Sequence, residues 1–178
     1  MGISQGGPER ALPGLTTGWR SMTAADLDRV AGIAVIGFPN HFEGRDCFEN
    51  RLALNPAGCF VLQTPGGLEG YLVAYPWTRD AAPTLNTLIE AIPADAGVLY
   101  LHDLVLTPAM RGQGWSRPAV AAVVDLARAS GRTTIALVAV NDAVDFWRGH
   151  GFDVRETPEM AAKLTSYGSD ARYMTRAV

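Results

Sequence analysis

The stretch PAMRGQGWSRPAVAAVVDLARASG, from Pro108 to Gly131, joins a loop rich in glycine and arginine directly to a helical pattern. Over residues 114–130 the apolar positions Ala119, Val123 and Ala127 recur at helical spacing, and Gly131 can end the helix in a left-handed conformation. Pro118 is compatible with this helix because it falls in the first turn, where no N–H donor is needed. Unpaired N–H groups and a partial positive charge at a helix start favour anions, so the loop predicts a phosphate-binding turn.

Two common nucleotide-binding motifs do not fit this loop. A Walker loop requires a lysine followed by serine or threonine after its last glycine, and no lysine is present. A dinucleotide-binding turn requires a third glycine, but Arg117 stands at that position. It also requires an acidic residue at a strand end about 20 positions later, and the sequence has none there.

The pattern around the loop predicts an α/β (α+β) fold. Strands are expected at 16–22, 58–64, 68–77, 97–106, 133–140, 151–158 and 171–178, with helices at 23–38, 45–55, 114–130 and 142–149. Thr23 and Asn141 are expected as N-caps. Residues 1–15 are expected to form a flexible tail and residues 16–178 a single domain whose mixed sheet is flanked by helices.

The loop resembles motif A of the GNAT superfamily of N-acetyltransferases. That motif is an apolar strand end followed by a loop x-Pro-x-x-Arg/Gln-x-x-Gly-x-Gly/Ala, and here it reads LVLTPAMRGQGWS, with Ser116 at the last small position. Downstream, FWRGHGF at 146–152 is similar to the family's motif B, Phe-Tyr-x-x-x-Gly-Phe. The resemblance covers roughly Trp19 to Val178 and implies a mostly antiparallel sheet whose two central parallel strands splay apart.

The resemblance also implies a site for acetyl-CoA as co-substrate, with no metal. The main chain of Leu104, Val105 and Leu106 is expected to pair with the pantetheine arm. The loop is expected to hold the pyrophosphate through Arg111, Gly112, Gln113, Gly114, Trp115, Ser116 and Arg117. Asn141 and Trp147 are expected near the pantetheine.

The reaction implied is attack of an amine on a thioester, for which a base must remove a proton from the amine. Strand alternation puts Tyr100 and His102 on one face, and His102 is the preferred base, with a structural histidine as the alternative. Asp103 is expected on the other face. His41 and Glu43 are second choices, and His150 is expected at a solvated surface position.

Two residues depart from the family pattern. Trp147 replaces the usual tyrosine acid, and an indole cannot give up its proton at ordinary pH. The proton for the leaving thiolate is therefore expected from water, the acceptor amine, Ser116 or Tyr173. Asn141 lies one position later than the family's asparagine, so it serves either as a helix cap alone or also as a pantetheine contact.

Composition narrows the partners. With 178 residues, a net charge of −3 and 19% charged residues, the chain is not typical of a nucleic-acid binder. Its two cysteines lie outside any CxxC motif, which favours a reducing cytoplasm, and no apolar run can span a membrane.

The expected acceptor is a small-molecule amine, and a homodimer is a further expectation. The alternatives are a catalytically idle acyl-CoA-binding module and a transferase that uses another acyl-CoA or acceptor. Aromatic residues expected near the acceptor are Phe38, Phe42, Tyr75, Trp77 and Tyr167.

Overall fold

The computed structural model describes residues 16–178 and contains one seven-stranded mixed sheet in the order β1-β2-β3-β4-β5-β7-β6. The tail predicted for residues 1–15 lies outside the described residues. The strands are β1 (Gly18–Ser21), β2 (Cys59–Thr64), β3 (Gly67–Thr78), β4 (Ala96–Leu106), β5 (Thr134–Ala139), β6 (Asp153–Val154) and β7 (Arg172–Ala177). Only β4 and β5 pair in parallel, so the predicted mixed, mostly antiparallel sheet is confirmed.

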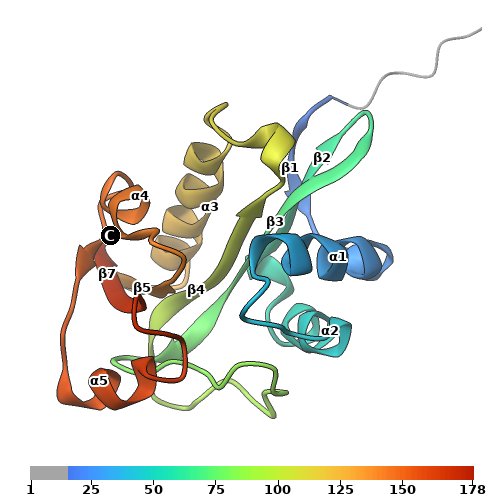
Figure 1. Ribbon diagram of the computed structural model, residues 1–178. Helices are drawn as coiled ribbons and strands as arrows, with labels where there is room; N and C mark the ends of the chain where they lie inside the picture. Colours follow the sequence, from blue (N-terminus) through green and yellow to red (C-terminus); the bar gives the residue numbers. More distant parts are fainter. Residues whose placement is uncertain (1–15) are drawn as a thin grey trace, which may run out of the picture.

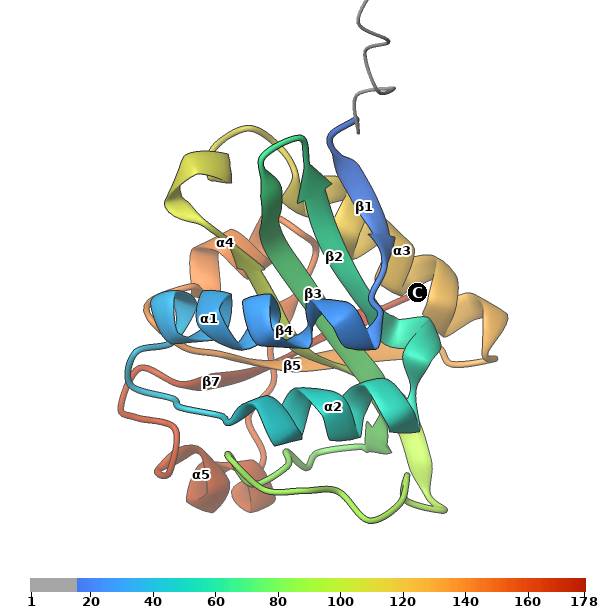
Figure 2. The same ribbon diagram turned by 90° about the vertical axis from the view of Figure 1, so that its right-hand side faces the viewer.

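Helices cover both faces of the sheet, as Figures 1 and 2 show. On one face lie α1 (Leu27–Gly37), α2 (Arg45–Leu54) and α5 (Pro158–Leu164); on the other lie α3 (Ser116–Ala129) and α4 (Val144–Arg148). Two apolar cores result, because strand side chains alternate between the faces. Tyr71 and Val73 join the α1/α2 core, whereas Leu72 and Ala74 join the α3 core.

The helix boundaries follow local signals. A short 3-10 turn, Ala24–Asp26, precedes α1, and the Thr23 N–H donates to the Asp26 carboxylate as the predicted cap implied. Gly131 has a φ of 70° and ends α3, with the Arg132 N–H donating to the Ala127 carbonyl. The described helices include none long and apolar enough to cross a membrane.

Two predictions about the C-terminal third were wrong. The strand expected at 151–158 is reduced to Asp153–Val154, and α5 follows it. The signal was present in the sequence: Thr157 caps α5 by accepting the Met160 N–H, and Pro158 occupies the first turn. Asn141 is not the cap of α4, since Ala143 precedes that helix and Asn141 has a φ of 55°.

Candidate functional site

The site begins where β4 and β5 separate. The two strands are paired only at Leu99–Ile135 and Tyr100–Ala136, although β4 continues to Leu106. Beyond Tyr100, β4 is therefore paired with β3 on one side and has no paired strand on its other edge, over the residues that the structure describes.

Main-chain polar groups face this gap. The Thr107 N–H donates to the Glu69 carbonyl, toward β3. Because successive residues of an antiparallel strand direct their N–H and C=O groups to opposite sides, those of Leu104 and Leu106 point toward the gap. The Leu106 carbonyl there accepts a hydrogen bond of 3.0 Å from Arg111 Nε. An extended ligand could complete this edge as an added strand.

The glycine-rich loop borders the same gap. Gly112 and Gly114 have φ values of 72° and 84°, and a Cβ built at either position would meet nothing within 4 Å. Both glycines are therefore required for the turn and face open space instead of packed atoms. A cavity of about 490 Å³ lies here, lined by Gly37, Phe38, Leu104, Val105, Leu106, Arg111, Gly112, Gly114, Trp115, Ser116 and Phe146.

Two residues expected at this cavity are not among those that line it. The Gln113 side chain donates to the Ala109 carbonyl within the loop. Arg117 lines a separate cavity of about 530 Å³ beside α3, together with His150 and Arg176, and its own N–H donates to the Gly114 carbonyl. The first turn of α3 directs this side chain sideways, which the linear motif did not reveal.

One residue that holds the loop was not found from the sequence. The Trp19 indole on β1 donates a hydrogen bond of 2.9 Å to the Trp115 carbonyl, at the start of α3. The two residues are 96 positions apart, and no local pattern connects them.

A second cavity, of about 170 Å³, continues along the gap. Phe38, Leu104 and Phe146 line it as well as the first cavity, so the two adjoin. Its further lining residues are Leu101, His102, Leu137, Val138, Val140, Asn141, Ala143 and Trp147. Trp147 is largely buried against Phe152 and Phe146, while the Asn141 amide donates to the Gly37 carbonyl at 3.4 Å.

The structure separates the residues considered as proton donors. Ser116 Oγ lies 3.1 Å from His150 Nε2, at the start of α3. His150 is partly exposed, and besides solvent it has Ser116 as a hydrogen-bond partner; burial, Arg117 and Arg176 lower its pKa. The Tyr173 hydroxyl accepts the Asp80 N–H and faces a cavity beside α5. The cavities that His102 lines contain neither Ser116 nor Tyr173.

Tyr100 and His102 do lie together, with ring centroids 6.1 Å apart, in a third cavity of about 40 Å³. Its lining residues are Ala34, Phe38, His41, Glu43, Phe48, Leu85, Tyr100, His102, Asp103, Val138, Val140 and Tyr167. Phe38 lines all three cavities, and Val138 and Val140 line the second and third, so the three form one series along the gap.

Asp103 lies on the same face as His102, which corrects the expectation from strand alternation. The register between β3 and β4 shifts where Val73 pairs with Asp103 and Ala74 pairs with Leu101. This bulge inserts His102 as an extra residue, so that His102 and Asp103 both turn toward α1 and α2. Asp103 is buried and accepts a hydrogen bond of 2.7 Å from the Tyr71 hydroxyl.

The bulge completes a buried polar network. His102 Nε2 lies 2.5 Å from Glu43 Oε2, and His102 Nδ1 lies 3.0 Å from the Tyr75 hydroxyl. Glu43 also accepts the Asn86 N–H, and Arg51 Nη2 lies 3.8 Å from it. One possible metal-ligand atom from each of Glu43, His102 and Asp103 lies within 4.8 Å of the other two. Each of these side chains already has a hydrogen-bonded side-chain partner, however. Glu43, His102 and Tyr75 therefore form a hydrogen-bonded network, and Asp103 lies beside it with Tyr71 as its own partner.

Charge pairing within the network outweighs burial for two of its groups. Burial disfavours the charged form of His102, yet the carboxylates of Asp103 and Glu43 raise its pKa. Burial likewise opposes ionised Glu43, but His102 and the Asn86 N–H lower its pKa. For Asp103 burial dominates, and its pKa is raised.

The aromatic residues expected near the acceptor divide into two groups. Phe38 and Tyr167 line the third cavity, whereas Tyr75 and Trp77 pack within the sheet and Phe42 is exposed. Sequence alone could not separate them, because all five occupy segments that approach the gap.

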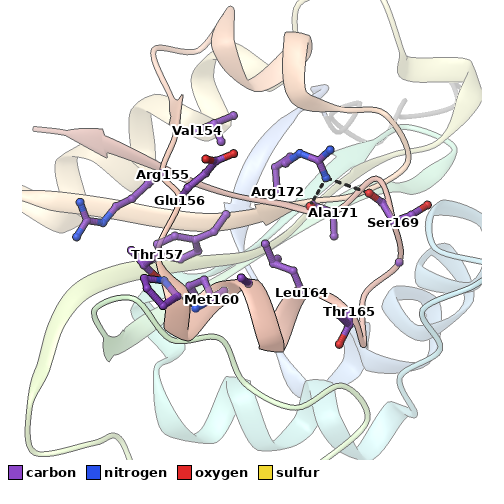
Figure 3. A pocket seen from close by; sticks show the side chains of 14 residues that line it. Val154, Arg155, Glu156, Thr157, Met160, Leu164, Thr165, Ser169, Ala171 and Arg172 are labelled. Atoms are coloured by element: carbon purple, nitrogen blue, oxygen red, sulfur yellow. Dashed lines mark hydrogen bonds between the residues drawn. The ribbon is translucent and has the colours of Figure 1, made fainter.

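A further cavity, of about 690 Å³, lies beside α5 (Figure 3). It shares no lining residue with the three cavities above. Its arginines are already engaged: Arg155 pairs with Asp80, and Arg172 donates to the Ser169 and Ala171 carbonyls. We therefore assign the candidate site to the gap between β4 and β5.

Comparison with known proteins identifies the family to which this fold belongs. A model of the acetyltransferase (GNAT) family matches residues 27–152, which include β4, the glycine-rich loop and the segment at 146–152. The chain belongs to the acetyltransferase (GNAT) family. It has no significant sequence match among curated proteins.

Solved structures of GNAT proteins share the fold at low identity. The chain is similar to Ard1 from Thermoplasma volcanium, with 17% identity, a TM-score of 0.70, and coverage of 92% of this chain and 99% of that one. It is similar to N-acetylglutamate synthase from Neisseria gonorrhoeae complexed with coenzyme A and N-acetyl-glutamate, with 17% identity, a TM-score of 0.68, and coverage of 92% and 35%. It is also similar to the GNAT-like decarboxylase GphF in complex with isobutyryl-CoA, with 19% identity, a TM-score of 0.71, and coverage of 89% and 98%.

Proposed function

We propose that this GNAT protein is an N-acetyltransferase that moves the acetyl group of acetyl-CoA to the amine of a small or amino-acid-like molecule, through a ternary complex. The observation that carries the proposal is the opened edge of β4, where the main-chain groups of Leu104 and Leu106 face the gap beside the glycine-rich loop. In this proposal residues 16–178 act as one acetyltransferase domain.

In the proposed complex, each part of the gap has a defined task. The edge of β4 pairs with the pantetheine amides, and the turn at Gly112 to Ser116 holds the pyrophosphate beside the start of α3. The thioester then lies near the second cavity, where Trp147 and Leu104 supply apolar walls. An N–H of β4 near the thioester oxygen would stabilise the charge that develops on attack. The third cavity, of about 40 Å³, has room for only a small group, so the amine end of the proposed acceptor enters it, beside Tyr100 and His102.

A direct test follows the thiol released from acetyl-CoA over a panel of amines that includes free amino acids, arylalkylamines and short peptides. We expect acetyl-CoA to raise the melting temperature, and at least one amine to produce thiol and its N-acetyl product. Peptides belong in the panel because solved neighbours include Arabidopsis thaliana Naa50 in complex with a bisubstrate analogue. An absence of any thermal shift at millimolar acetyl-CoA would contradict the proposal.

A second candidate is an acyl-CoA-binding module without transferase activity. Two features favour it: Trp147 stands where the family motif has tyrosine, and both ring nitrogens of His102 are hydrogen-bonded to side chains. This candidate predicts tight acetyl-CoA binding with no product from any amine, which the same assay distinguishes.

A further inference from the structure

Two histidines line the third cavity, and they differ in whether a ring nitrogen is free. His102 has both nitrogens bonded, to Glu43 and to Tyr75. His41 Nε2 lies 2.6 Å from the Tyr167 carbonyl, whereas His41 Nδ1 is buried and has no hydrogen-bond partner within residues 16–178. The loop between α1 and α2 carries His41.

The partners fix where the protons reside. A carbonyl oxygen can only accept, so His41 Nε2 must carry a hydrogen, and in the neutral ring the lone pair is on Nδ1. Neutral His102 donates from Nε2 to Glu43 and accepts the Tyr75 hydroxyl at Nδ1; protonated His102 donates from both nitrogens. In neither state does His102 have a free lone pair.

We propose that His41 is the general base that deprotonates the acceptor amine, and that His102 is a fixed member of the polar network; the inference rests on the proposed function. It deepens that function by naming the residue that receives the proton. A base must lie within hydrogen-bond reach of the proton that it removes. His41 lines the cavity proposed for the acceptor amine and has a free acceptor atom, Nδ1, which is buried and which the amine must reach on binding.

The surroundings of His41 hold its ring in one orientation. The Phe38 ring packs edge-on against it, with centroids 6.5 Å apart. The Tyr167 carbonyl that accepts from Nε2 is itself anchored, because the Tyr167 hydroxyl donates to the Pro83 carbonyl at 2.5 Å. Further along the same segment, Arg172 donates to the Ser169 and Ala171 carbonyls, as Figure 3 shows. A base held in this way needs little reorganisation on binding.

Two carboxylates lie in the surroundings of His41, those of Asp170 and Glu43. Backbone hydrogen bonds, first that of the Asp142 N–H, lower the pKa of Asp170, and the charge of His41 adds a smaller effect in the same direction. Glu43 lines the same cavity as an ionised carboxylate. Of the remaining titratable groups of the cavity, His102 and Asp103 have hydrogen-bonded side-chain partners, and burial raises the pKa of Tyr100 and Tyr167.

The proposed step balances as follows. His41 Nδ1 takes one proton from the acceptor ammonium, which leaves a neutral amine. The amine nitrogen forms a bond to the thioester carbon, and collapse of the intermediate breaks the carbon–sulfur bond. The second proton lost from nitrogen goes to the CoA thiolate, giving the free thiol, and His41 returns its proton to solvent.

The test compares three variants with the wild type, using acetyl-CoA and the best amine of the panel. His41→Gln can keep an amide donor for the Tyr167 carbonyl but has no basic nitrogen, and we expect kcat to fall about 100-fold or more. The KM for acetyl-CoA should stay within about twofold of the wild type, because His41 does not line the first cavity. In His41→Ala, added imidazole should restore activity. Asn40→Ala, an exposed change in the same loop, is the matched control and should keep full activity.

A fourth variant separates the two histidines. His102→Gln should keep kcat within about tenfold of the wild type if it folds, and if it does not, imidazole rescue of His41→Ala decides the matter. A His41→Gln protein with more than half of the wild-type kcat, or a His41→Ala protein that imidazole leaves inactive, would overturn the inference alone. A wild-type protein that binds acetyl-CoA but acetylates no amine would refute the proposed function, and the inference with it.

Discussion

The two halves of the gap differ in which groups line them, main chain in one and side chains in the other. The half beside the glycine-rich loop presents main chain: the edge of β4, two glycines with positive φ and the start of α3. The half beside α1 and α2 presents side chains, with Glu43 hydrogen-bonded to His102 and the buried Asp103 close beside them. A main-chain surface tolerates many sequences except where a side chain would obstruct it, whereas a buried ionic network depends on every member.

Removal of a network charge should give the largest effect. Glu43→Gln leaves Arg51 and protonated His102 without their carboxylate partner, and we expect the free energy of unfolding to fall by about 3 kcal/mol. Urea titration at pH 6 measures the change. Glu49→Gln, on the exposed face of α2, is the control and should change stability by less than about 0.5 kcal/mol. Equal effects of the two substitutions would remove the contrast between the halves.

Obstruction of the main-chain half should affect binding more than folding. Gly114→Val places a branched side chain in open space beside the loop, and we expect acetyl-CoA affinity to fall about 100-fold, measured by calorimetry. Gly131→Val is a matched control, because Gly131 also has positive φ and free space around it but lies at the far end of α3. It should show similar strain, about 1–2 kcal/mol, with unchanged affinity.

The pH dependence of stability should sharpen the contrast further. Because the pKa of Glu43 is lowered in the folded protein, ionised Glu43 stabilises the fold at pH values above its unfolded pKa of 4.5. This stabilisation is lost as the pH falls through the folded pKa. Because the pKa of His102 is raised in the folded protein, protonated His102 stabilises the fold fully at pH values below its unfolded pKa of 6.5. This stabilisation is lost as the pH rises through the folded pKa. The stability difference between wild type and His102→Gln should therefore be largest between pH 4.5 and 6.5. A difference that does not change from pH 5 to 9 would contradict the assigned charges.

The smallest effect is expected where a single side chain supports the main-chain half. Trp19→Phe removes the hydrogen bond to the Trp115 carbonyl and should weaken acetyl-CoA binding by about threefold to tenfold, or about 1 kcal/mol. Phe keeps most of the apolar contact, so the melting temperature should fall only slightly. An affinity change as large as that of Gly114→Val would mean that the loop depends on side chains after all.

The family and the sheet were readable from the sequence because their signals are local. Glycines at a helix start, the period of α3 and the apolar strands on either side are properties of neighbouring residues. The sequence does contain a helix-start signal for α5, an N-cap at Thr157 followed by Pro158 in the first turn. The helix was not predicted because the expected strand at 151–158 was extended over this signal.

What the sequence by itself determined is the main-chain half: a loop whose glycines adopt positive φ and which leads into the start of α3. Only the tertiary structure decided the side-chain half. The bulge that turns Asp103 toward His102, and the pairing of His102 with Glu43, depend on the register between β3 and β4 and on segments 59 residues apart. The state of His41 likewise depends on a carbonyl 126 residues away, and no local pattern encodes which ring nitrogen is left free.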